Sequence, residues 1–470
     1  MLAGLIGTLA LACHVAGIAA AIHAVMHVRT PQGAIGWMLA LIFVPYLALP
    51  PYLFLGSSHF HGYTQVQRLR SRQTRPAPWP GRGEYLAKHP PRPECARYRA
   101  IGRMLGARFH GGHRLRLLID GAATFAALFD AIGQAERQVL VQFFIIHDDA
   151  LGRRLQQVLL ERAAAGVHVC VLYDSIGSHA LPRHYVDTLR RGGVDIRPFA
   201  TRRWRNRFQL NFRNHRKIVV VDGWRGFLGG LNVGDEYLGL KPPLSPWRDT
   251  HLEVQGPAVA DLQRSFARDW RWATGEEAPF MPPRAGPGTA SVLTVATGPA
   301  DPQESGSLFF VEAIHAARRR VWLTTPYFVP DQAVLAALRL AVLRGVDVRI
   351  LLPARPDHRM VFLASTLRAH EAIRAGVRLY RYQPGFLHQK VLLIDEDTAA
   401  VGSMNLDSRS FRLNFEITAL AVDRAFAGEV EAMLAADFAR SRAVDLAEYR
   451  HAPFLRRLAM HLVWLLEPVL

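Results

Sequence analysis

Two long apolar stretches open the chain. Among its first 67 residues, Arg29 is the one Asp, Glu, Lys or Arg. The stretch on each side of Arg29 is long enough for a membrane span of about 20 residues. The pattern predicts a helical hairpin with helices over about residues 3–26 and 34–56. Prolines at 45, 50 and 51 leave open a kinked or partly re-entrant second segment.

A cleaved signal peptide is the competing interpretation of the first apolar stretch. It lacks the basic segment that precedes the apolar core of a signal peptide, and a second apolar block follows it. The hairpin is followed at once by four arginines, Arg68, Arg70, Arg72 and Arg75. Because basic residues are enriched on the cytoplasmic side of a membrane, we expect the rest of the chain there, and the N-terminus as well.

Beyond about residue 113 the pattern alternates between strands and helices. Strand-like runs at 138–146 and 167–173 enclose a helical pattern at 151–165. The same order returns later, with strands at 320–329 and 346–352 and a helix at 332–344. A repeat with so long a period indicates an internal duplication, and alternating strands and helices favour an α/β fold with mixed sheets covered by helices.

The composition divides the chain into six segments. A stretch rich in Gly and Pro separates the two repeats, and the last segment has arginines near its start and leucines on one helical face. That last segment is either an interfacial amphipathic helix or a helix packed on the core. We expect a transmembrane hairpin over 1–59, a basic juxtamembrane connector over 60–110, a first half over 111–275, a linker over 276–306, a second half over 307–448 and the terminal helix over 449–470.

The chain is strongly basic, with 57 Lys and Arg against 39 Asp and Glu. A net charge of +18 favours an anionic partner: nucleic acid, a phospholipid surface or a phosphorylated substrate. Residues 202–213 combine five arginines with Trp204, Phe208 and Phe212. This segment could clamp nucleic-acid phosphates, dip into an anionic membrane or form a solvated loop, and the preceding hairpin favours the membrane.

Lysine is rare in this chain: four of the 57 basic residues are lysines. Two of them lie in the same frame, H-x-K-x4-D, repeated 173 residues apart. A chain that otherwise prefers arginine keeps lysine where a compact, rotatable ammonium is needed. In an extended segment the His and Lys of one motif project to the same side. The two motifs are His215, Lys217 and Asp222, and His388, Lys390 and Asp395.

Each motif is followed by a Gly-x-x-Asn element, which ends at Asn232 in the first repeat and Asn405 in the second. Two histidines, two lysines and two asparagines suit a phosphodiester. The lysines and amides can neutralise the non-bridging oxygens. One imidazole can attack phosphorus, and the other can protonate the leaving alkoxide and then deprotonate the incoming hydroxyl. We expect no metal and no cofactor, since this chemistry needs neither.

These elements, with WRDTH at 247–251, PYFVPD at 326–331 and GSMNLDSRSFRLNFE at 402–416, resemble the phospholipase D superfamily. Within it the chain is similar to the bacterial cardiolipin synthases. The resemblance implies a duplicated bilobal fold of two α/β/α sandwich halves that share one active site, preceded by the hairpin. It also implies an enzyme of the bacterial inner membrane, multi-pass, with a cytoplasmic catalytic part.

The resemblance implies a role for each candidate residue. His215 and His388 are the nucleophile and the acid/base pair; family habit makes His215 the nucleophile, although the near-symmetry of the motifs leaves the order open. Lys217, Lys390, Asn232 and Asn405 hold phosphate. Asp222 and Asp395 complete the motifs and are counted with the catalytic residues, where they support structure and charge. Two further residues are expected to orient the histidine of the opposite half, namely His251 and Glu416.

The implied reaction joins two phosphatidylglycerols into cardiolipin and releases glycerol through a phosphohistidine. The alternatives are a phospholipase D that transfers the intermediate to water, and a membrane-tethered phosphodiesterase or nuclease. The expected partners are membrane phospholipids and an anionic membrane surface, with no nucleic acid. The identity of the second substrate and the oligomeric state are left open.

Overall fold

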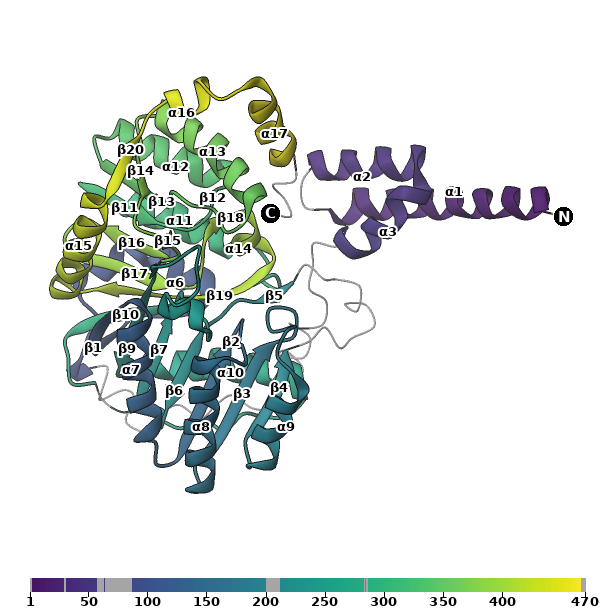
Figure 1. Ribbon diagram of the computed structural model, residues 1–470. Coiled ribbons are helices and arrows are strands. Elements are labelled where there is room, and N and C mark those ends of the chain that lie inside the picture. The colour runs from purple at the N-terminus through teal and green to yellow at the C-terminus, as the bar shows by residue number, and fades with distance from the viewer. Residues whose placement is uncertain are drawn as a thin grey trace. The chain divides into compact units, whose positions relative to one another are not determined.

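The computed structural model describes residues 2–28, 31–56, 63, 87–199, 212–282, 284 and 286–465 (Figure 1). These residues form two compact units, one made chiefly of the first 70 residues and one that holds the rest. The expectations for the arginines at 68–75 and for most of the 202–213 segment concern residues outside the described ranges.

Within its described residues the N-terminal unit contains three helices, α1 (Leu2–His27), α2 (Pro31–Phe43) and α3 (Pro45–Leu55). Their buried contacts centre on Ala24 and Leu41. The predicted second helix is divided at Val44, because Pro45 begins a new helix. Within the described residues, one helix, Gly4–His27, is long and apolar enough to cross a membrane. The second segment therefore has the kinked form that its prolines left open.

The larger unit is built on a single sheet of 16 strands within the described residues. From its centre, the first half runs outward through seven strands in the order β1-β9-β7-β6-β2-β3-β4. The last three run parallel to one another, and the neighbouring pairs before them are antiparallel. These strands are β1 (His110–Ile119), β9 (Thr250–Gln255), β7 (Arg225–Gly229), β6 (Ile218–Val221), β2 (Gln138–Phe143), β3 (His168–Asp174) and β4 (Asp195–Phe199).

The second half repeats this order position by position, as β10-β19-β17-β16-β11-β13-β14, and adds β20 at its edge. The predicted duplication is therefore confirmed at the level of strand order. These strands are β10 (Ala290–Thr297), β19 (Asn414–Val422), β17 (Thr398–Gly402), β16 (Val391–Ile394), β11 (Arg320–Thr324), β13 (Asp347–Pro353), β14 (Arg378–Tyr382) and β20 (Ser441–Val444).

Helices cover both faces of the sheet. Every residue of β2 is buried: Val139, Val141 and Phe143 join the core cluster of the first half, whereas Gln142 on the other face reaches Asp269 of α10. Strands buried on both faces lack polar alternation, which explains the apolar runs of the sequence. The helices are α7 (Asp120–Gly133), α8 (Ala150–Ala164), α9 (Arg183–Arg191) and α10 (Val259–Thr274), then α11 (Ser305–Ala316), α12 (Gln332–Leu343), α13 (Arg359–Arg374) and α15 (Arg424–Ala439).

Corresponding helices begin with the same type of cap. Asp149 accepts a hydrogen bond from the Gly152 N–H at the start of α8, and Asp331 accepts one from the Val334 N–H at the start of α12. Such caps satisfy an N–H group that the first turn leaves unpaired, each contributing about 1 kcal/mol. The duplication therefore extends to local capping as well as topology.

The two halves join through an antiparallel pair of strands. His110 and His113 of β1 lie opposite Val292 and Ala290 of β10. The segment predicted as a linker over 276–306 thus contains a central strand of the sheet. The Gly and Pro residues that flank this strand made the segment resemble a linker. The predicted connector over 60–110 likewise ends in ordered helix, η1 (Pro93–Tyr98) and α6 (Arg99–Leu105).

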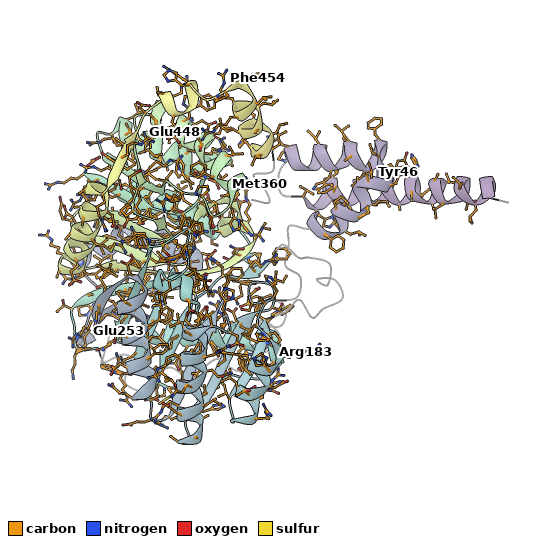
Figure 2. All side chains as sticks on the ribbon, viewed as in Figure 1. Tyr46, Arg183, Glu253, Met360, Glu448 and Phe454 are labelled. Carbon is orange, nitrogen blue, oxygen red and sulfur yellow. The ribbon has the colours of Figure 1, made fainter. Side chains whose placement is uncertain are left out.

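The chain's last described elements are α16 (Ala447–Arg450) and α17 (Phe454–Trp464). Helix α17 packs on α13, where the Arg368 guanidinium lies 5.3 Å from the centre of the Trp464 ring and Met460 is fully buried. Its opposite face is apolar and exposed, including Phe454 (labelled in Figure 2) and Leu462. The helix is thus packed on the core and amphipathic at once, and it begins at Phe454 rather than at the predicted residue 449.

Candidate active site

Two short strand pairs connect the halves beside the H-x-K motifs. β5 (Arg213–Asn214) precedes His215 and pairs with the start of β19 in the second half. β15 (Phe386–Leu387) precedes His388 and pairs with β8 (Trp247–Arg248) of the first half. Each motif therefore follows a strand that is held by the opposite half. The His and Lys of each motif lie just before β6 and β16 rather than within these strands, and the Asp comes just after them.

His215 is fixed by three contacts with the second half. Its backbone N–H donates to the Phe415 carbonyl at 3.0 Å. Its Nδ1 lies 3.0 Å from both carboxylate oxygens of Glu416. Glu416 is itself held by the Ser403 hydroxyl and, at 3.0 Å, by the Asn414 amide. The structure thus places Glu416 against the histidine of the opposite half, as expected.

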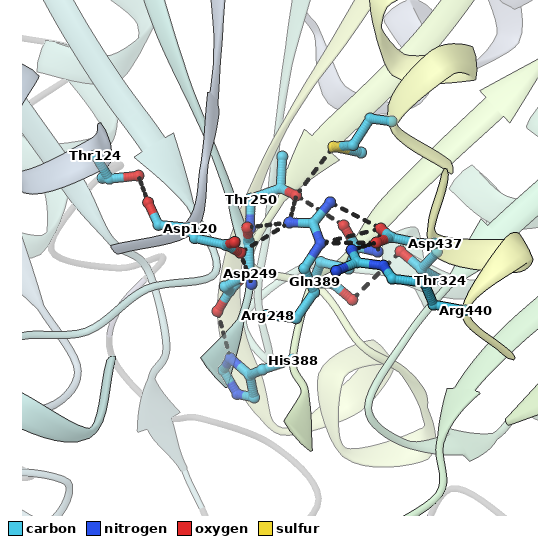
Figure 3. Close-up of polar contacts among 11 residues, drawn as sticks. Asp120, Thr124, Arg248, Asp249, Thr250, Thr324, His388, Gln389, Asp437 and Arg440 are labelled. Atoms are coloured by element: carbon cyan, nitrogen blue, oxygen red, sulfur yellow. Dashed lines mark hydrogen bonds and ion pairs between the residues drawn. The ribbon is translucent and has the colours of Figure 1, made fainter. Parts of the chain in front are cut away.

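His388 has the mirrored arrangement. Its N–H donates to the Arg248 carbonyl at 2.8 Å, and its Nδ1 lies 2.7 Å from the Asp249 carboxylate (Figure 3). The Thr250 N–H donates to the other oxygen of Asp249 at 2.8 Å. The expectation for His251 is wrong: its Nδ1 accepts a hydrogen bond from the Leu231 N–H at 3.4 Å, and Asp249 is the residue that contacts His388.

The carboxylates select one tautomer of each ring. A carboxylate accepts a proton from Nδ1–H, so the lone pair of a neutral imidazole then resides on Nε2. Nε2 is thereby available to attack phosphorus or to accept a proton. His215 and His388 are both buried but keep a small solvent-exposed surface, with exposed fractions of 8% and 7%.

The two lysines are buried beside these histidines. The Lys217 ammonium donates to the His215 carbonyl at 2.8 Å and lies 5.3 Å from the centre of the Phe144 ring. The Lys390 ammonium donates to the His388 carbonyl. Burial lowers the pKa of Lys217 well below its ordinary value and lowers the pKa of Lys390 to about 8. Each ammonium keeps further N–H donors for an anion.

The charges of the two halves act on one another, which indicates that the motifs converge. The pKa of His215 is lowered to about 4, chiefly by burial and in part by Lys390 of the opposite half. Burial likewise lowers the pKa of His388 to about 4, with a smaller lowering by Lys217. Glu416 and Asp249 oppose these shifts. At neutral pH both rings are therefore neutral until an anion enters.

The two asparagines differ in their contacts. Asn232 is occupied by the protein, since its Oδ1 accepts from the Ile145 N–H at 3.2 Å and its Nδ2 donates to the Tyr237 hydroxyl at 3.0 Å. Oδ1 of Asn405 is buried and has no hydrogen-bond partner among the described residues. Phosphate binding by the two amides stays a prediction.

Asp222 and Asp395 do not join this cluster. The Asp222 carboxylate accepts hydrogen bonds from the backbone N–H groups of Glu136, Arg137 and Gln138, at 2.8–2.9 Å. Asp395 binds the N–H groups that precede and begin β11 and also the Arg97 guanidinium. Each aspartate follows its strand, roughly 20 Å of extended chain from its histidine. Their place among the catalytic residues is therefore corrected: they brace the start of the neighbouring strand.

Both aspartates also adopt a left-handed backbone, with φ of 50°. Asp and Asn tolerate this conformation better than most residues with a Cβ. The last position of H-x-K-x4-D thus combines a turn that favours Asp with a carboxylate that satisfies several backbone donors.

A second layer of buried ion pairs was missed by the sequence interpretation. Asp269 of α10 binds the Arg216 guanidinium at 2.8 Å, next to His215. Asp437 of α15 binds Arg248 at 2.8 Å and also the Gln389 amide at 2.9 Å (Figure 3). These pairs fix the residues adjacent to the histidines and to Asp249. Aligning the two halves by β9 and β19 would have found Asp249 as the counterpart of Glu416.

Within the described ranges, no group of three or more His, Cys, Asp or Glu side chains is arranged to hold a metal ion. The candidate groups are instead a set of imidazoles, ammonium groups and amides. Such a set can bind an anion, supply a nucleophile and move a proton.

A duplicated α/β fold with one carboxylate-bound histidine from each half defines a protein of the phospholipase D class. The chain belongs to the family described as cardiolipin synthase, phospholipase D-like domain, whose model matches residues 128–270 and 310–438. A second model, the phospholipase D-nuclease N-terminal segment, matches residues 15–57.

Curated relatives match almost the whole chain. Cardiolipin synthase A of Pseudomonas entomophila is 56% identical over 466 residues, covering 97% of each chain. Cardiolipin synthase A of Pseudomonas aeruginosa PAO1 is 57% identical over 477 residues, covering 99% of this chain and 96% of its own. Among solved structures, phosphatidylserine synthase of Haemophilus influenzae has a TM-score of 0.61 at 16% identity, covering 80% of this chain and 100% of its own, which shows a shared fold.

Proposed function

We propose that this protein is a phosphatidyltransferase that joins two phosphatidylglycerols into cardiolipin and releases glycerol. The observation that carries the proposal is the pair of buried histidines, each bound at Nδ1 by a carboxylate of the opposite half. Relatives 56–57% identical over nearly the full chain are named cardiolipin synthase A, which supports the same conclusion.

In the first step, Nε2 of one histidine attacks the phosphorus of phosphatidylglycerol. The P–N bond forms as the bond from phosphorus to the glycerol oxygen breaks, and the other histidine gives that oxygen its proton. The resemblance assigns the attack to His215 and the proton to His388. Lys217 and Lys390 neutralise the non-bridging oxygens as charge develops. An entering phosphodiester raises the pKa of each nearby imidazole, so His388 can hold the proton that it then gives up.

In the second step, the hydroxyl of a second phosphatidylglycerol takes the place of the departed glycerol. His388 removes its proton, the oxygen attacks phosphorus, and the P–N bond to His215 breaks. Cardiolipin leaves and both histidines return to their starting states. The burial of this site favours transfer to a lipid hydroxyl over transfer to water.

The test is product analysis with purified full-length protein and labelled phosphatidylglycerol in detergent micelles. We expect labelled cardiolipin and free glycerol. Phosphatidic acid without cardiolipin would identify a hydrolase, and cleavage of DNA without lipid turnover would identify a nuclease. His215→Ala and His388→Ala should each abolish turnover. His388→Ala denatured at alkaline pH, where a phosphohistidine is stable, should retain covalently bound phosphate if His215 is the nucleophile.

We also propose that the hairpin crosses the membrane twice and leaves the catalytic unit in the cytoplasm. Helix α1 is long enough to span alone, and α2 with α3 supply a second apolar path of similar length. Reporter fusions test this. A periplasmic reporter should be active when fused after His27 and inactive when fused after Leu470. Activity at both positions would contradict the second crossing.

The exposed apolar face of α17 supports contact with a lipid surface. Leu455, Leu462 and Leu465 are 76%, 55% and 67% exposed there. Arginines on the same helix suit anionic headgroups. In a soluble form that begins after the hairpin, replacing Leu455 and Leu462 by Asp should reduce sedimentation with phosphatidylglycerol vesicles. Unchanged sedimentation would place the lipid contact elsewhere.

A further inference from the structure

At one position beside the paired asparagines, the two halves carry side chains of different chemistry. Ile146 bridges Val233 in the first half, and Phe328 of β12 (Phe328–Val329) pairs with Leu406 of β18 (Leu406–Asp407) in the second. The residue before each pair lies next to Asn232 or Asn405 in the same register. It is Ile145 in the first half and Tyr327 in the second. Since an isoleucine is compatible with this bridge, the fold does not require a phenol there.

Tyr327 is joined to an acidic residue. Its hydroxyl donates to the carboxylate of Asp357, which lies in the loop before α13. The His358 N–H donates to the other oxygen of Asp357 at 2.7 Å, and the Asp357 side chain is 18% exposed. The carboxylate is thus held in place but keeps lone pairs accessible to a ligand.

The Tyr327–Asp357 pair lies near the active-site residues around His388. The charge of Asp357 acts on Lys390 and on Tyr237. The Tyr237 ring centre lies 6.4 Å from that of His388. Opposite Tyr327 in the β12–β18 register is Asn405, which is 5% exposed and whose Oδ1 has no hydrogen-bond partner among the described residues.

The polar atoms that gather here are mainly acceptors. They are the Asp357 carboxylate, Oδ1 of Asn405 and the Tyr327 oxygen, whose own proton is given to Asp357. Acceptors repel phosphate oxygens and suit hydroxyl donors. A carboxylate with a second acceptor nearby can bind both hydroxyls of a vicinal diol, and a diol is what the glycerol headgroup presents beyond its phosphate ester.

We propose that Tyr327, Asp357 and Asn405 form a diol-binding pocket that selects a glycerol headgroup on the His388 side of the phosphate. The inference rests on the proposed phosphatidyl transfer. The leaving glycerol and the attacking glycerol hydroxyl occupy the same side of phosphorus, opposite the nucleophile, because the second step is the first in reverse. The pocket therefore binds both free hydroxyls of the donor headgroup in the first step. In the second step it can bind the single hydroxyl that remains free on the acceptor glycerol, since one oxygen attacks phosphorus and another carries the acceptor lipid's phosphate.

The test compares two donor lipids, phosphatidylglycerol and phosphatidylmethanol, the second of which has no headgroup hydroxyl. Full-length protein in micelles is assayed for release of glycerol or methanol, and kcat/KM is measured for each. Wild-type protein should favour phosphatidylglycerol. Asp357→Asn and Tyr327→Phe should each lower the ratio of the two kcat/KM values tenfold or more, because a site built for hydroxyls loses discrimination when its partner is removed.

The control variant is Glu396→Gln, since Glu396 is half exposed and pairs with Arg319 outside the site. It should keep both the rates and the ratio of wild-type protein. An equal loss on both lipids in the Asp357 and Tyr327 variants would show a structural role and overturn the pocket. An unchanged ratio would also overturn it. Absence of glycerol release by wild-type protein would instead overturn the phosphatidyl transfer on which the pocket rests.

Discussion

The Asp249 carboxylate lies 2.7 Å from Nδ1 of His388, and this contact crosses from the first half of the molecule to the second. Glu416 makes the reciprocal contact with His215 at 3.0 Å. Each half thus supplies the histidine that the other half orients. Neither motif histidine has its Nδ1 bound by a carboxylate of its own half, so duplication of the fold yields one active site rather than two.

Replacing Asp249 by Asn should lower kcat for cardiolipin formation by a factor of about 10²–10⁴ and leave KM nearly unchanged. The amide keeps the shape but stabilises the wrong tautomer of His388, the effect known for the equivalent aspartate of serine proteases. Steady-state rates over a series of phosphatidylglycerol concentrations measure both constants.

The matched control is His251→Gln, two residues further along the chain in β9. Gln can still accept the hydrogen bond that His251 accepts from Leu231. We expect its kcat within severalfold of wild type at equal folded protein. If the His251 variant lost as much kcat as the Asp249 variant, the orienting role would not be specific to Asp249.

Replacing Lys217 by Arg should abolish most of the activity although the charge is kept. Lys217 is fully buried, with its ammonium between the His215 carbonyl and the Phe144 ring. A guanidinium is larger and planar, and it cannot rotate three donors about a compact centre. Cardiolipin formation by Lys217→Arg is compared with that by Lys241→Arg, whose side chain is half exposed. Full activity of the Lys217 variant would show that arginine suffices in the site.

Much of the fold followed from the sequence. The helix and the second strand of each repeat were predicted to within a residue, and α8 and α12 begin at aspartate caps. The first strand, β2 or β11, was predicted with the right start but three to five residues too long. Strand β10 was missed because the surrounding Gly and Pro residues resemble a linker. Its place at the centre of the sheet depends on pairing with β1 and β19, which are far away in sequence.

The site was less predictable than the motifs. The histidines and lysines repeat in one local frame and could be found by spacing. Asp249 could not be chosen over His251 by spacing, because both can face the same side of a strand, and the pairing of β8 with β15 decides between them. The aspartates that end the motifs were counted with the catalytic residues because they lie close to the histidines in sequence. Their spacing is local, but their partners are backbone groups at the start of β2 and β11.

Replacing Asp222 by Asn should lower stability rather than kcat. The variant loses the charge that accepts three backbone hydrogen bonds, and bonds to a charged group contribute about 1.5–3 kcal/mol. We expect a thermal midpoint several degrees lower and a kcat close to wild type per folded molecule. Calorimetry and active-site titration separate the two. A large loss of kcat with an unchanged midpoint would return Asp222 to the catalytic machinery.

Stability should also fall in mild acid because of the buried histidines. The pKa of His215 and of His388 is about 4 in the folded protein, below the ordinary value of 6.5. Between these two values the unfolded chain binds more protons than the folded one. The free energy of unfolding therefore decreases as pH falls from about 6.5 to 4. Denaturant titrations at several pH values measure this slope, and replacing either histidine by Asn should reduce it.

The alkaline side of the activity profile should report on Lys390. Burial lowers the pKa of Lys390 to about 8, so its ammonium loses a proton as pH rises through that value. A neutral amine no longer stabilises the phosphate charge, and kcat/KM, which follows the free enzyme, should therefore fall above about pH 8. Initial rates on labelled phosphatidylglycerol from pH 6 to 10 measure this decline in kcat/KM. Lys390→Arg stays charged throughout this range. Its activity should be low, and its kcat/KM should not decline above pH 8. A wild-type kcat/KM that stays constant up to pH 10 would show that Lys390 keeps its proton or that its charge is not needed.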